Sequence, residues 1–423
     1  MSQPTRILLS LILGLIAGIG SITAGGEWVD RAVALAQPVG DTWLNGLRMT
    51  IVPLVVALLI TGIAATPETA RSGRIAGRSL ILFFTFLVCA SATAAWLTPT
   101  YLALFPLPGQ SAAALRSALS GAQSVGDVPG MAGFLKALVP TNPVAAAAND
   151  AIVPLIVFTM AFAFAITRLP DEQRRTLTAF FQAIADAMLV IVGWVLWLAP
   201  IGVGALAYVV GARAGTGAVG ALVHYILIVS AVGATICLIA YPVAVLGGRR
   251  GFITFARAVA PAQAVAISTQ SSLASLPAML RGAGTLGVPV GTSGVVLPLA
   301  VAVFRVTAPP MNLAVILYIA HWYGIALTPV HYATAIAVAS VTTFSGVGLP
   351  GQITFYAGVA PIGLAIGVPI EALGLLIAVE SIPDIFRTIG NVTMDVAVTT
   401  VISERVAGDA ATSEADTILN ARP

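Results

Sequence analysis

Charged residues are scarce in this chain of 423 residues. Aspartate, glutamate, lysine and arginine make up 9% of it, whereas hydrophobic residues make up 58%. A soluble domain carries roughly 25% charged residues, so a protein of this length could not cover a water-exposed surface with so few. The composition therefore excludes a cytosolic enzyme, a nucleic-acid binder and a disordered protein.

Cysteine and histidine are equally rare. The two cysteines, Cys89 and Cys237, both lie in apolar runs, which excludes a disulfide framework. The three histidines, His224, His321 and His331, lack the spacing of metal ligands. We therefore expect no metal site and no cofactor.

Long uncharged apolar runs are what the sequence has instead. A bilayer span needs about 20 mostly apolar residues. Charge-free runs of about that length or longer cover residues 7–26, 49–67, 79–115, 187–212 and 214–248, and a shorter one covers 151–167. They predict six helices before residue 250, at about 7–27, 44–66, 78–99, 147–168, 178–211 and 218–246. The first run resembles a signal peptide, but no small-residue cleavage site follows, so a retained helix is favoured.

Basic residues indicate how these helices are oriented. Cytoplasmic loops of membrane proteins carry an excess of arginine and lysine. With the N-terminus inside, all the arginine clusters fall inside, whereas Arg31, Arg48, Arg116, Lys136 and Arg213 fall outside. We expect a multi-pass protein of the cell (inner) membrane with both termini cytoplasmic and a polar tail at 406–423.

After residue 250 the pattern changes to short apolar arms around small-residue tips. The hydroxyl-rich patch 268–277 separates the arms 253–267 and 276–290, and the patch 345–352 is flanked in the same way. Such arms are too short to cross a bilayer, so each pair predicts a helical hairpin that enters and returns on one side. A longer helix follows each hairpin, at about 292–325 and 368–402. Two hairpin-plus-helix units indicate an inverted repeat with a binding site where they meet. Two ordinary loops between full spans are the alternative.

The first of these longer helices has a break, at Thr307-Ala308-Pro309-Pro310, because proline removes amide donors. The second carries a polar stripe. No aspartate or glutamate occurs between Asp186 and Glu371, and then six polar residues follow at helical spacing: Glu380, Asp384, Arg387, Thr388, Asn391 and Asp395. Five of them fall within about 80° of the helix circumference. Because a charge at mid-bilayer costs roughly 2.5–3.5 kcal/mol, this stripe must face protein or water, and a ligand site is favoured over a structural ion-pair network.

The residue types narrow the ligand. Arg387 can clamp a carboxylate through two parallel hydrogen bonds, and Asp384, one turn earlier, can accept an ammonium group. Thr388, Asn391 and the hairpin residues Gln270, Ser271 and Ser272 can bind a second carboxylate. The pattern predicts a small acidic amino acid as substrate.

Several motifs resemble the dicarboxylate/amino acid:cation symporters, the family of the glutamate and aspartate transporters. The resemblance runs from about residue 7 to 405. It shows at 47–54 (LRMTIVPL), 139–143 (VPTNP), 198–203 (LAPIGV), 297–299 (LPL) and 348–351 (GLPG), and it is most specific at Arg387-Thr388 followed by Asn391-Val392-Thr393-Met394-Asp395.

The resemblance implies an all-α polytopic membrane protein with eight transmembrane helices, two re-entrant hairpins, inverted repeats and a homotrimeric assembly: the glutamate-transporter elevator fold. It implies scaffold helices 1 and 2 in 1–76, helix 3 of the transport domain in 77–100, and an external loop with scaffold helices 4 and 5 in 101–213. The transport domain continues through 214–405, with helix 6, hairpin 1 at about 253–290, helix 7 at about 292–325, hairpin 2 at about 328–366 and helix 8 at about 368–402. Asp384 would hold the substrate amine and Arg387 its side-chain carboxylate, with Leu349 as a lid contact.

The chain departs from the family where sodium is expected to bind. The family carries Asn-Met-Asp-Gly-Thr at the middle-helix break, but here the matching stretch is Phe304-Arg305-Val306-Thr307-Ala308. Leu87, Val88 and Gly346 stand where hydroxyls are expected. Only Asn391 and Asp395 remain of the ion ligands, and Arg305 needs a partner such as Asp395. We expect Arg305 to replace a bound sodium ion and Glu380 to be a possible proton carrier, because a desolvated carboxyl can hold its proton near neutral pH.

Other functions fit the same residues. A carrier of C4-dicarboxylates such as succinate, fumarate or malate would not need Asp384, and a conventional sodium-coupled symporter would not need Arg305. A channel or a membrane-embedded enzyme is a third class, but the hairpin serines have no histidine near them in sequence to act as a base. A transporter rather than an enzyme is therefore expected.

Overall fold

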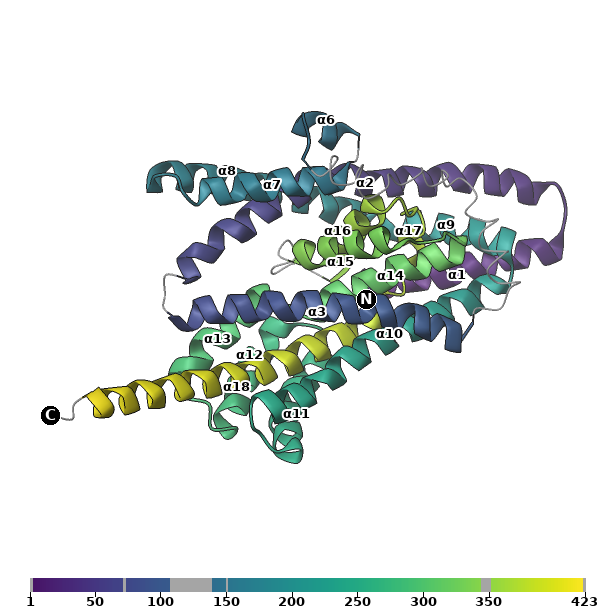
Figure 1. Ribbon diagram of the computed structural model, residues 1–423. Helices are drawn as coiled ribbons and strands as arrows, with labels where there is room; N and C mark the ends of the chain where they lie inside the picture. Colours follow the sequence, from purple (N-terminus) through teal and green to yellow (C-terminus); the bar gives the residue numbers. More distant parts are fainter. Residues whose placement is uncertain (1–2, 71–73, 107–138, 150, 344–350, 421–423) are drawn as a thin grey trace. The chain divides into compact units, whose positions relative to one another are not determined.

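The computed structural model describes residues 3–70, 74–106, 139–149, 151–343 and 351–420 (Figure 1). Every regular element within these ranges is a helix, and none of them contains a strand. Among the described segments, eight are long and apolar enough to cross a membrane: Gln3–Ala24, Trp28–Ile63, Arg78–Leu104, Asp171–Trp197, Gly217–Gly247, Phe252–Thr269, Val290–Tyr323 and Ser381–Arg405. The prediction of an all-α polytopic membrane protein is confirmed.

The chain divides into two compact units. Unit 1 comprises Met1–Ala65, Ser91–Val232 and Pro309–Pro383, and unit 2 comprises Thr66–Ala90, Gly233–Ala308 and Asp384–Pro423. The elements that lie wholly or mostly in unit 1 are α1 (Gln3–Ala24), α2 (Trp28–Ala70), α6 (Pro143–Ala148), α7 (Ile152–Ile166), α8 (Asp171–Trp197), α9 (Ala199–Ala214), α10 (Gly217–Pro242), α14 (Ala308–Tyr323), α15 (Pro329–Thr342), α16 (Gly351–Ala365) and α17 (Leu373–Leu376). Unit 2 holds η1 (Val243–Gly247), α11 (Phe252–Thr269), α12 (Ser272–Thr285), α13 (Val290–Val303) and nearly all of α18 (Ser381–Asn420). The chain passes from one unit to the other within α2, α3 (Arg74–Leu104) and α10, and in the first turns of α14 and α18, so that the last part of α10 belongs to unit 2.

Small residues let two helices of unit 1 pack closely. On α1, a β-carbon added at Gly14 would lie 2.5 Å from the Gly204 carbonyl oxygen of α9, and one added at Gly18 would lie 2.3 Å from the Tyr208 carbonyl oxygen. Helices in membranes associate through such small-residue contacts because lipid offers no hydrophobic drive between them. The Gly14–Gly18 spacing therefore fixes α1 against α9.

Four predicted helix boundaries are wrong. The helix predicted at 44–66 begins at Trp28, because it is part of α2. The helix predicted at 178–211 is two helices, because α8 ends at Trp197 and α9 begins at Ala199, with Pro200 in its first turn where a missing amide costs little. The helix predicted to end at residue 99 continues through Pro99 to Leu104. The stretch 406–420, predicted as a tail, continues α18.

One predicted span is too short to cross a bilayer alone. α7 has 15 residues, which at 1.5 Å per residue is about 22 Å of helix against a hydrocarbon core of about 30 Å. A six-residue helix, α6, precedes it, capped by Asn142, whose side chain accepts hydrogen bonds from the Val144 and Ala145 amides. The predicted span 147–168 is therefore interrupted at its start.

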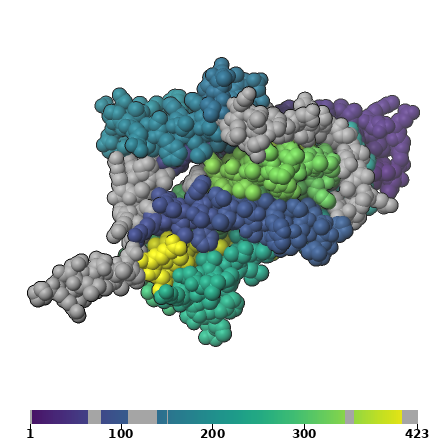
Figure 2. All heavy atoms as spheres, viewed as in Figure 1, coloured from purple at the N-terminus to yellow at the C-terminus, as the bar shows by residue number. Residues whose placement is uncertain are grey.

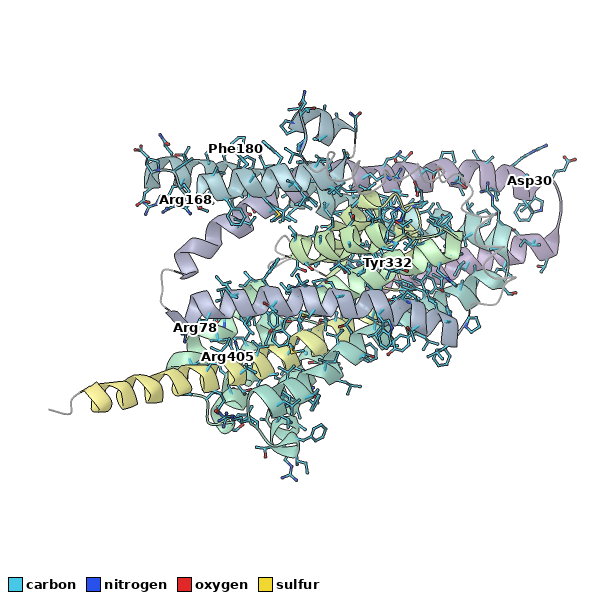
Figure 3. The ribbon with its side chains drawn as sticks, viewed as in Figure 1. Asp30, Arg78, Arg168, Phe180, Tyr332 and Arg405 are labelled. Atoms are coloured by element: carbon cyan, nitrogen blue, oxygen red, sulfur yellow. The ribbon has the colours of Figure 1, made fainter. Side chains whose placement is uncertain are left out.

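Charged residues mark the ends of the units in Figure 3. Within unit 1, Asp30 near the start of α2 and Arg168 after α7 lie toward opposite ends. Within unit 2, Arg78 of α3 and Arg405 of α18 lie toward the same end.

The first predicted hairpin corresponds to two packed helices of unit 2. One of them, Phe252–Thr269, is long and apolar enough to cross a membrane, so the prediction that both arms are too short is wrong for that arm. α11 and α12 are joined at Gln270, which has a left-handed backbone (φ 51°, ψ 34°), and Ser271, which caps α12 by accepting a hydrogen bond from the Ala274 amide at 3.2 Å. Gly282 of α12 lies against the Ala258 carbonyl of α11. Large apolar side chains are exposed on both arms, at Phe252, Ile253, Ile267 and Leu273, and Figure 2 shows this region at the surface.

The arms of the second predicted hairpin are α15 and α16 of unit 1, which contact each other. Thr328 begins α15 in a capping box with His331, whose Nδ1 accepts a hydrogen bond from the Thr328 amide at 2.8 Å. Most of its predicted tip, including Gly346 and Leu349, lies outside the described residues.

Gly282→Ala is expected to destabilise the first hairpin. The added β-carbon would lie 2.5 Å from the Ala258 carbonyl oxygen, so the two arms must separate, at a cost of about 1–3 kcal/mol. Gly284→Ala is the matched control, because nothing lies within 4 Å of a β-carbon at that position of the same helix. The melting temperature of the purified variants checks this, and equal values for both would contradict the close packing of the arms.

Candidate substrate and ion site

α18 carries the predicted polar stripe. Its first five turns hold Asp384, Arg387, Thr388, Asn391 and Asp395, and all five are buried. Pro383 is the third residue of α18, where its missing amide hydrogen needs no partner. Its ring would clash with the carbonyl of residue 379, four residues earlier, which disfavours a helix that extends back past Ser381. Asp384 consequently lies in the first turn, where the helix dipole favours a negative charge.

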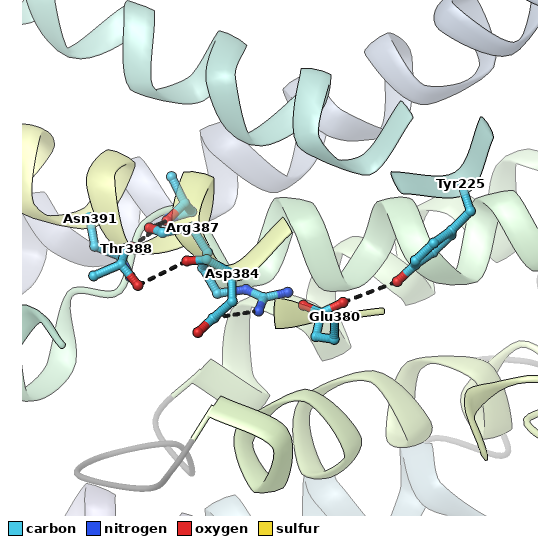
Figure 4. A network of polar contacts seen from close by, with 7 residues as sticks. Tyr225, Glu380, Asp384, Arg387, Thr388 and Asn391 are labelled. Atoms are coloured by element: carbon cyan, nitrogen blue, oxygen red, sulfur yellow. Dashed lines mark hydrogen bonds and ion pairs between the residues drawn. The ribbon is translucent and has the colours of Figure 1, made fainter. Parts of the chain in front are cut away.

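Glu380 is not on this helix, so that part of the stripe prediction is wrong. Residues 377–380 form turns before α18, and Glu380 belongs to unit 1. There it is buried and accepts a hydrogen bond from the Tyr225 hydroxyl of α10 at 3.1 Å (Figure 4). Tyr225 is a partner that the sequence did not indicate, because it lies 155 residues away along the chain.

Arg387 and Asp384 form a buried ion pair. Arg387 Nη1 donates to Asp384 Oδ1 at 2.8 Å, and their side chains are 2% and 10% exposed (Figure 4). Thr388 donates from its hydroxyl to the Asp384 carbonyl at 2.9 Å. Burying two charges is costly unless they are paired, and each of these two groups compensates the charge of the other. It also places opposite charges one turn apart, as a zwitterion requires.

The break before α14 packs on this part of α18. α13 ends at Val303 and α14 begins at Ala308, so the break lies at 304–307, slightly earlier than predicted. Pro309 and Pro310 lie in the first turn of α14, where their missing amides need no partners.

Thr307 ties the break to α18. The Thr307 amide donates to Asn391 Oδ1 at 2.9 Å, and the Thr307 hydroxyl lies 2.5 Å from both Asn391 Oδ1 and the Arg387 carbonyl oxygen. All three residues are buried. The sequence placed Thr307 at a helix break but did not indicate that it contacts the stripe, because a backbone amide at a break is not visible in a side-chain pattern.

Phe304 and Arg305 occupy the same break. The Phe304 ring is buried and stacks on Phe83 of α3 with ring centroids 4.4 Å apart, and it meets Phe86 edge-on at 6.2 Å. Arg305 interacts electrostatically with Asp384 and with Asp395, which attract it, and with Arg387, which repels it. The four charged groups, Arg305, Arg387, Asp384 and Asp395, sum to zero.

The first hairpin is joined to α18 through Gln263. Gln263 Nε2 donates to the Thr393 hydroxyl at 2.8 Å, and the Cys237 thiol of α10 also contacts that hydroxyl. Gln270, Ser271 and Ser272 at the hairpin tip belong to the same unit as the stripe. Leu349, the remaining predicted substrate contact, lies outside the described residues.

Comparisons with known proteins agree with this architecture. Residues 4–405 match the sodium:dicarboxylate symporter family. The chain is 27% identical to the proton/glutamate-aspartate symporter of Escherichia coli, over 92% of this chain and 89% of that protein. It is 28% identical to the proton/sodium-glutamate symport protein of Bacillus subtilis, over 95% of this chain and 92% of that protein. It is 26% identical to C4-dicarboxylate transport protein 2 of Ralstonia nicotianae, over 94% of this chain and 88% of that protein.

Proposed function

Because the chain belongs to the sodium:dicarboxylate symporter family, we propose that it is a secondary active transporter of small acidic amino acids, of the aspartate and glutamate type. The buried Arg387–Asp384 pair carries this proposal. A substrate carboxylate replaces Asp384 on the guanidinium, and the substrate ammonium neutralises the carboxylate that is released. Thr388, Asn391 and the tip residues Gln270, Ser271 and Ser272 complete the pocket, with Leu349 as a lid contact.

A carrier of C4-dicarboxylates is the second candidate, favoured by the similarity to the Ralstonia protein. Such a substrate has no amine, so it would bring negative charge against Asp384 with nothing to neutralise it. Truncating or failing to satisfy one partner of a buried charge pair costs about 2–5 kcal/mol. The acidic amino acid is therefore preferred.

Transport follows an elevator scheme in this proposal. Residues 77–100 and 214–405 form a transport domain that slides along a scaffold of residues 1–76 and 101–213, within a homotrimer. The α11–α12 and α15–α16 hairpins are re-entrant; the exposed apolar side chains of Phe252 and Leu273 suit an apolar environment. Both termini are cytoplasmic in the inner membrane. The grouping of Arg78 with Arg405 toward one end of unit 2 supports that orientation, because cytoplasmic ends carry an excess of arginine (Figure 3).

Sodium does not fit the described residues as a coupling ion. Sodium needs several hard oxygen ligands, yet the stretch where the family supplies them holds the aromatic cluster of Phe304, Phe83 and Phe86. With their usual charges, Arg305, Arg387, Asp384 and Asp395 sum to zero without a bound cation, so Arg305 supplies the positive charge that an ion would bring. We therefore infer that Arg305 stands in for the ion and that transport is sodium-independent.

A proton is the remaining candidate for coupling. Glu380 is buried and accepts a hydrogen bond from Tyr225. A desolvated carboxyl favours its neutral form, so Glu380 can carry a proton across and release it on the other side. The charged residues of α18 and of the break at 304–307 sum to zero, so a bound acidic amino acid adds one net negative charge. One proton on Glu380 compensates for that charge.

Uptake of L-aspartate into proteoliposomes tests the coupling. A pH gradient, acid outside, is expected to drive accumulation, and an inward sodium gradient is expected to give no more uptake than choline. Glu380→Gln is expected to retain exchange of labelled for unlabelled substrate but to lose proton-driven accumulation, because the amide cannot release a proton. Glu172→Gln, an exposed position on α8, is the control and should retain both activities.

The opposite pattern would overturn the coupling scheme. If sodium drives concentrative uptake and the pH gradient does not, the chain is a conventional sodium-coupled symporter and Arg305 does not replace an ion. If Glu380→Gln still accumulates substrate in response to the pH gradient, Glu380 is structural.

A further inference from the structure

The hydrogen bonds of Thr307 fix the orientation of the Asn391 carboxamide. An asparagine side chain can be turned so that its oxygen and nitrogen exchange places, and its hydrogen-bond partners decide between the two. The Thr307 backbone amide lies 2.9 Å from Asn391 Oδ1 and can only donate. In the turned orientation the Asn391 NH2 group would face the Thr307 amide, and two donors cannot form a hydrogen bond with each other. The oxygen of Asn391 must therefore face Thr307, and its nitrogen must face away.

Both acceptor positions of that oxygen are then used. The Thr307 amide occupies one, and the Thr307 hydroxyl, 2.5 Å away, occupies the other. The same hydroxyl lies 2.5 Å from the Arg387 carbonyl oxygen, so its proton is shared between two oxygens of α18. These are hard oxygen atoms of the kind that a sodium ion requires, and a hydroxyl of the chain itself already satisfies them.

Gly390 shows that the contact is built into the packing. A β-carbon at Gly390 would lie 2.3 Å from Cγ2 of Thr307, so only glycine leaves room for the threonine methyl group at this point of α18.

We infer that Thr307 is a positioning residue that takes over the contact a coupling cation would make with α18. It holds the break against Asn391 and Arg387, so that Asn391 presents only its N–H groups to the substrate site. Of the two roles predicted for Asn391, it therefore retains carboxylate binding and loses ion binding. The inference deepens the proposed function and relies on it for the identity of the substrate.

Two variants separate the hydroxyl from the shape of the side chain. Thr307→Val keeps the shape and removes the hydroxyl, and Thr307→Ser keeps the hydroxyl. By isothermal titration with L-aspartate in sodium-free buffer, Thr307→Val is expected to bind about tenfold more weakly than the wild type, because Asn391 Oδ1 keeps only the backbone amide of its two donors and the Arg387 carbonyl loses the hydroxyl. Thr307→Ser is expected to stay within about threefold. Wild-type affinity in Thr307→Val, or an equal loss in both variants, would overturn the inference.

If no acidic substrate binds the wild type, the proposed function is refuted but the role of Thr307 is not. A measurement without ligand then tests the inference. Melting temperatures are compared for Thr307→Val, Asn391→Leu and the double variant. Thr307→Val is expected to lower the melting temperature of the wild type. In the Asn391→Leu background, where the acceptor is already absent, the same substitution is expected to lower it by less than half as much. Additive shifts would show that the two side chains are not coupled. Stabilisation of the wild type by sodium over choline, abolished by Asn391→Leu, would also overturn the inference.

Discussion

Arg387→Met is expected to abolish uptake of every acidic substrate, with a loss of about thirtyfold or more in substrate affinity. The guanidinium is the buried cation that clamps the substrate carboxylate, and removing one partner of a buried charge pair costs about 2–5 kcal/mol. Arg387→Lys keeps the charge but not the two parallel bonds, so it is expected to recover only part of the affinity. Titration with L-aspartate and with succinate measures both.

Misfolding is the alternative explanation if Arg387→Met neither binds nor transports substrate, because this substitution leaves Asp384 buried without its ion-pair partner. The melting temperature and size-exclusion profile of Arg387→Lys address this, because that variant retains a positive charge. Arg281→Met removes an exposed arginine from α12 and is the matched control, expected to bind and transport as the wild type does. Undiminished substrate binding by a folded Arg387→Met protein would refute the assigned role.

Asp384→Asn is expected to separate the two candidate substrates. An amino acid loses the charge-assisted bond between its ammonium group and the carboxylate, so its affinity should fall by about a hundredfold. A C4-dicarboxylate loses a repulsive neighbour, so its affinity should stay the same or rise. Competition of L-aspartate and of succinate against a labelled substrate measures the difference.

The control for this variant is another acid on the same helix. Glu404 pairs with Arg250 at 2.7 Å, far along α18 from the stripe, so Glu404→Gln should leave both affinities unchanged. Equal losses for both substrates in Asp384→Asn would mean that Asp384 only orients Arg387. Retained L-aspartate affinity would mean that the ammonium group binds elsewhere.

The stripe on α18 could be predicted because its cause is local. Charges spaced by three and four residues in an apolar stretch can only share one helix face, and Asp384, Arg387 and Asn391 do so. The pairing of two helices in the first hairpin could be predicted for a similar reason: Ser271 can cap a helix, so the chain ends one helix and begins another at this point.

The misplaced features depend on single prolines. Pro383 moves the start of α18 beyond Glu380, and Pro200 divides the helix predicted at 178–211, whereas Pro99 lies inside α3 without ending it. A proline in sequence indicates that one backbone bond is lost, but neighbouring packing decides whether the helix continues.

The contacts of Thr307 and Tyr225 could not be predicted from the sequence. Each joins residues 80 or more positions apart, and the donor in one case is a backbone amide at a helix break. Side-chain periodicity carries no information about such pairs. These contacts are the ones that bear on coupling, so the sequence indicates the substrate class more directly than the coupling ion.

Isothermal titration of the purified wild type with L-aspartate, in buffer with choline in place of sodium, tests most directly whether the Arg387–Asp384 pair is a substrate site. We predict a saturable heat with one site per chain, unchanged when sodium replaces choline, and absent in Arg387→Met. An equal heat in wild type and Arg387→Met, or no heat with any acidic amino acid or C4-dicarboxylate, would contradict it.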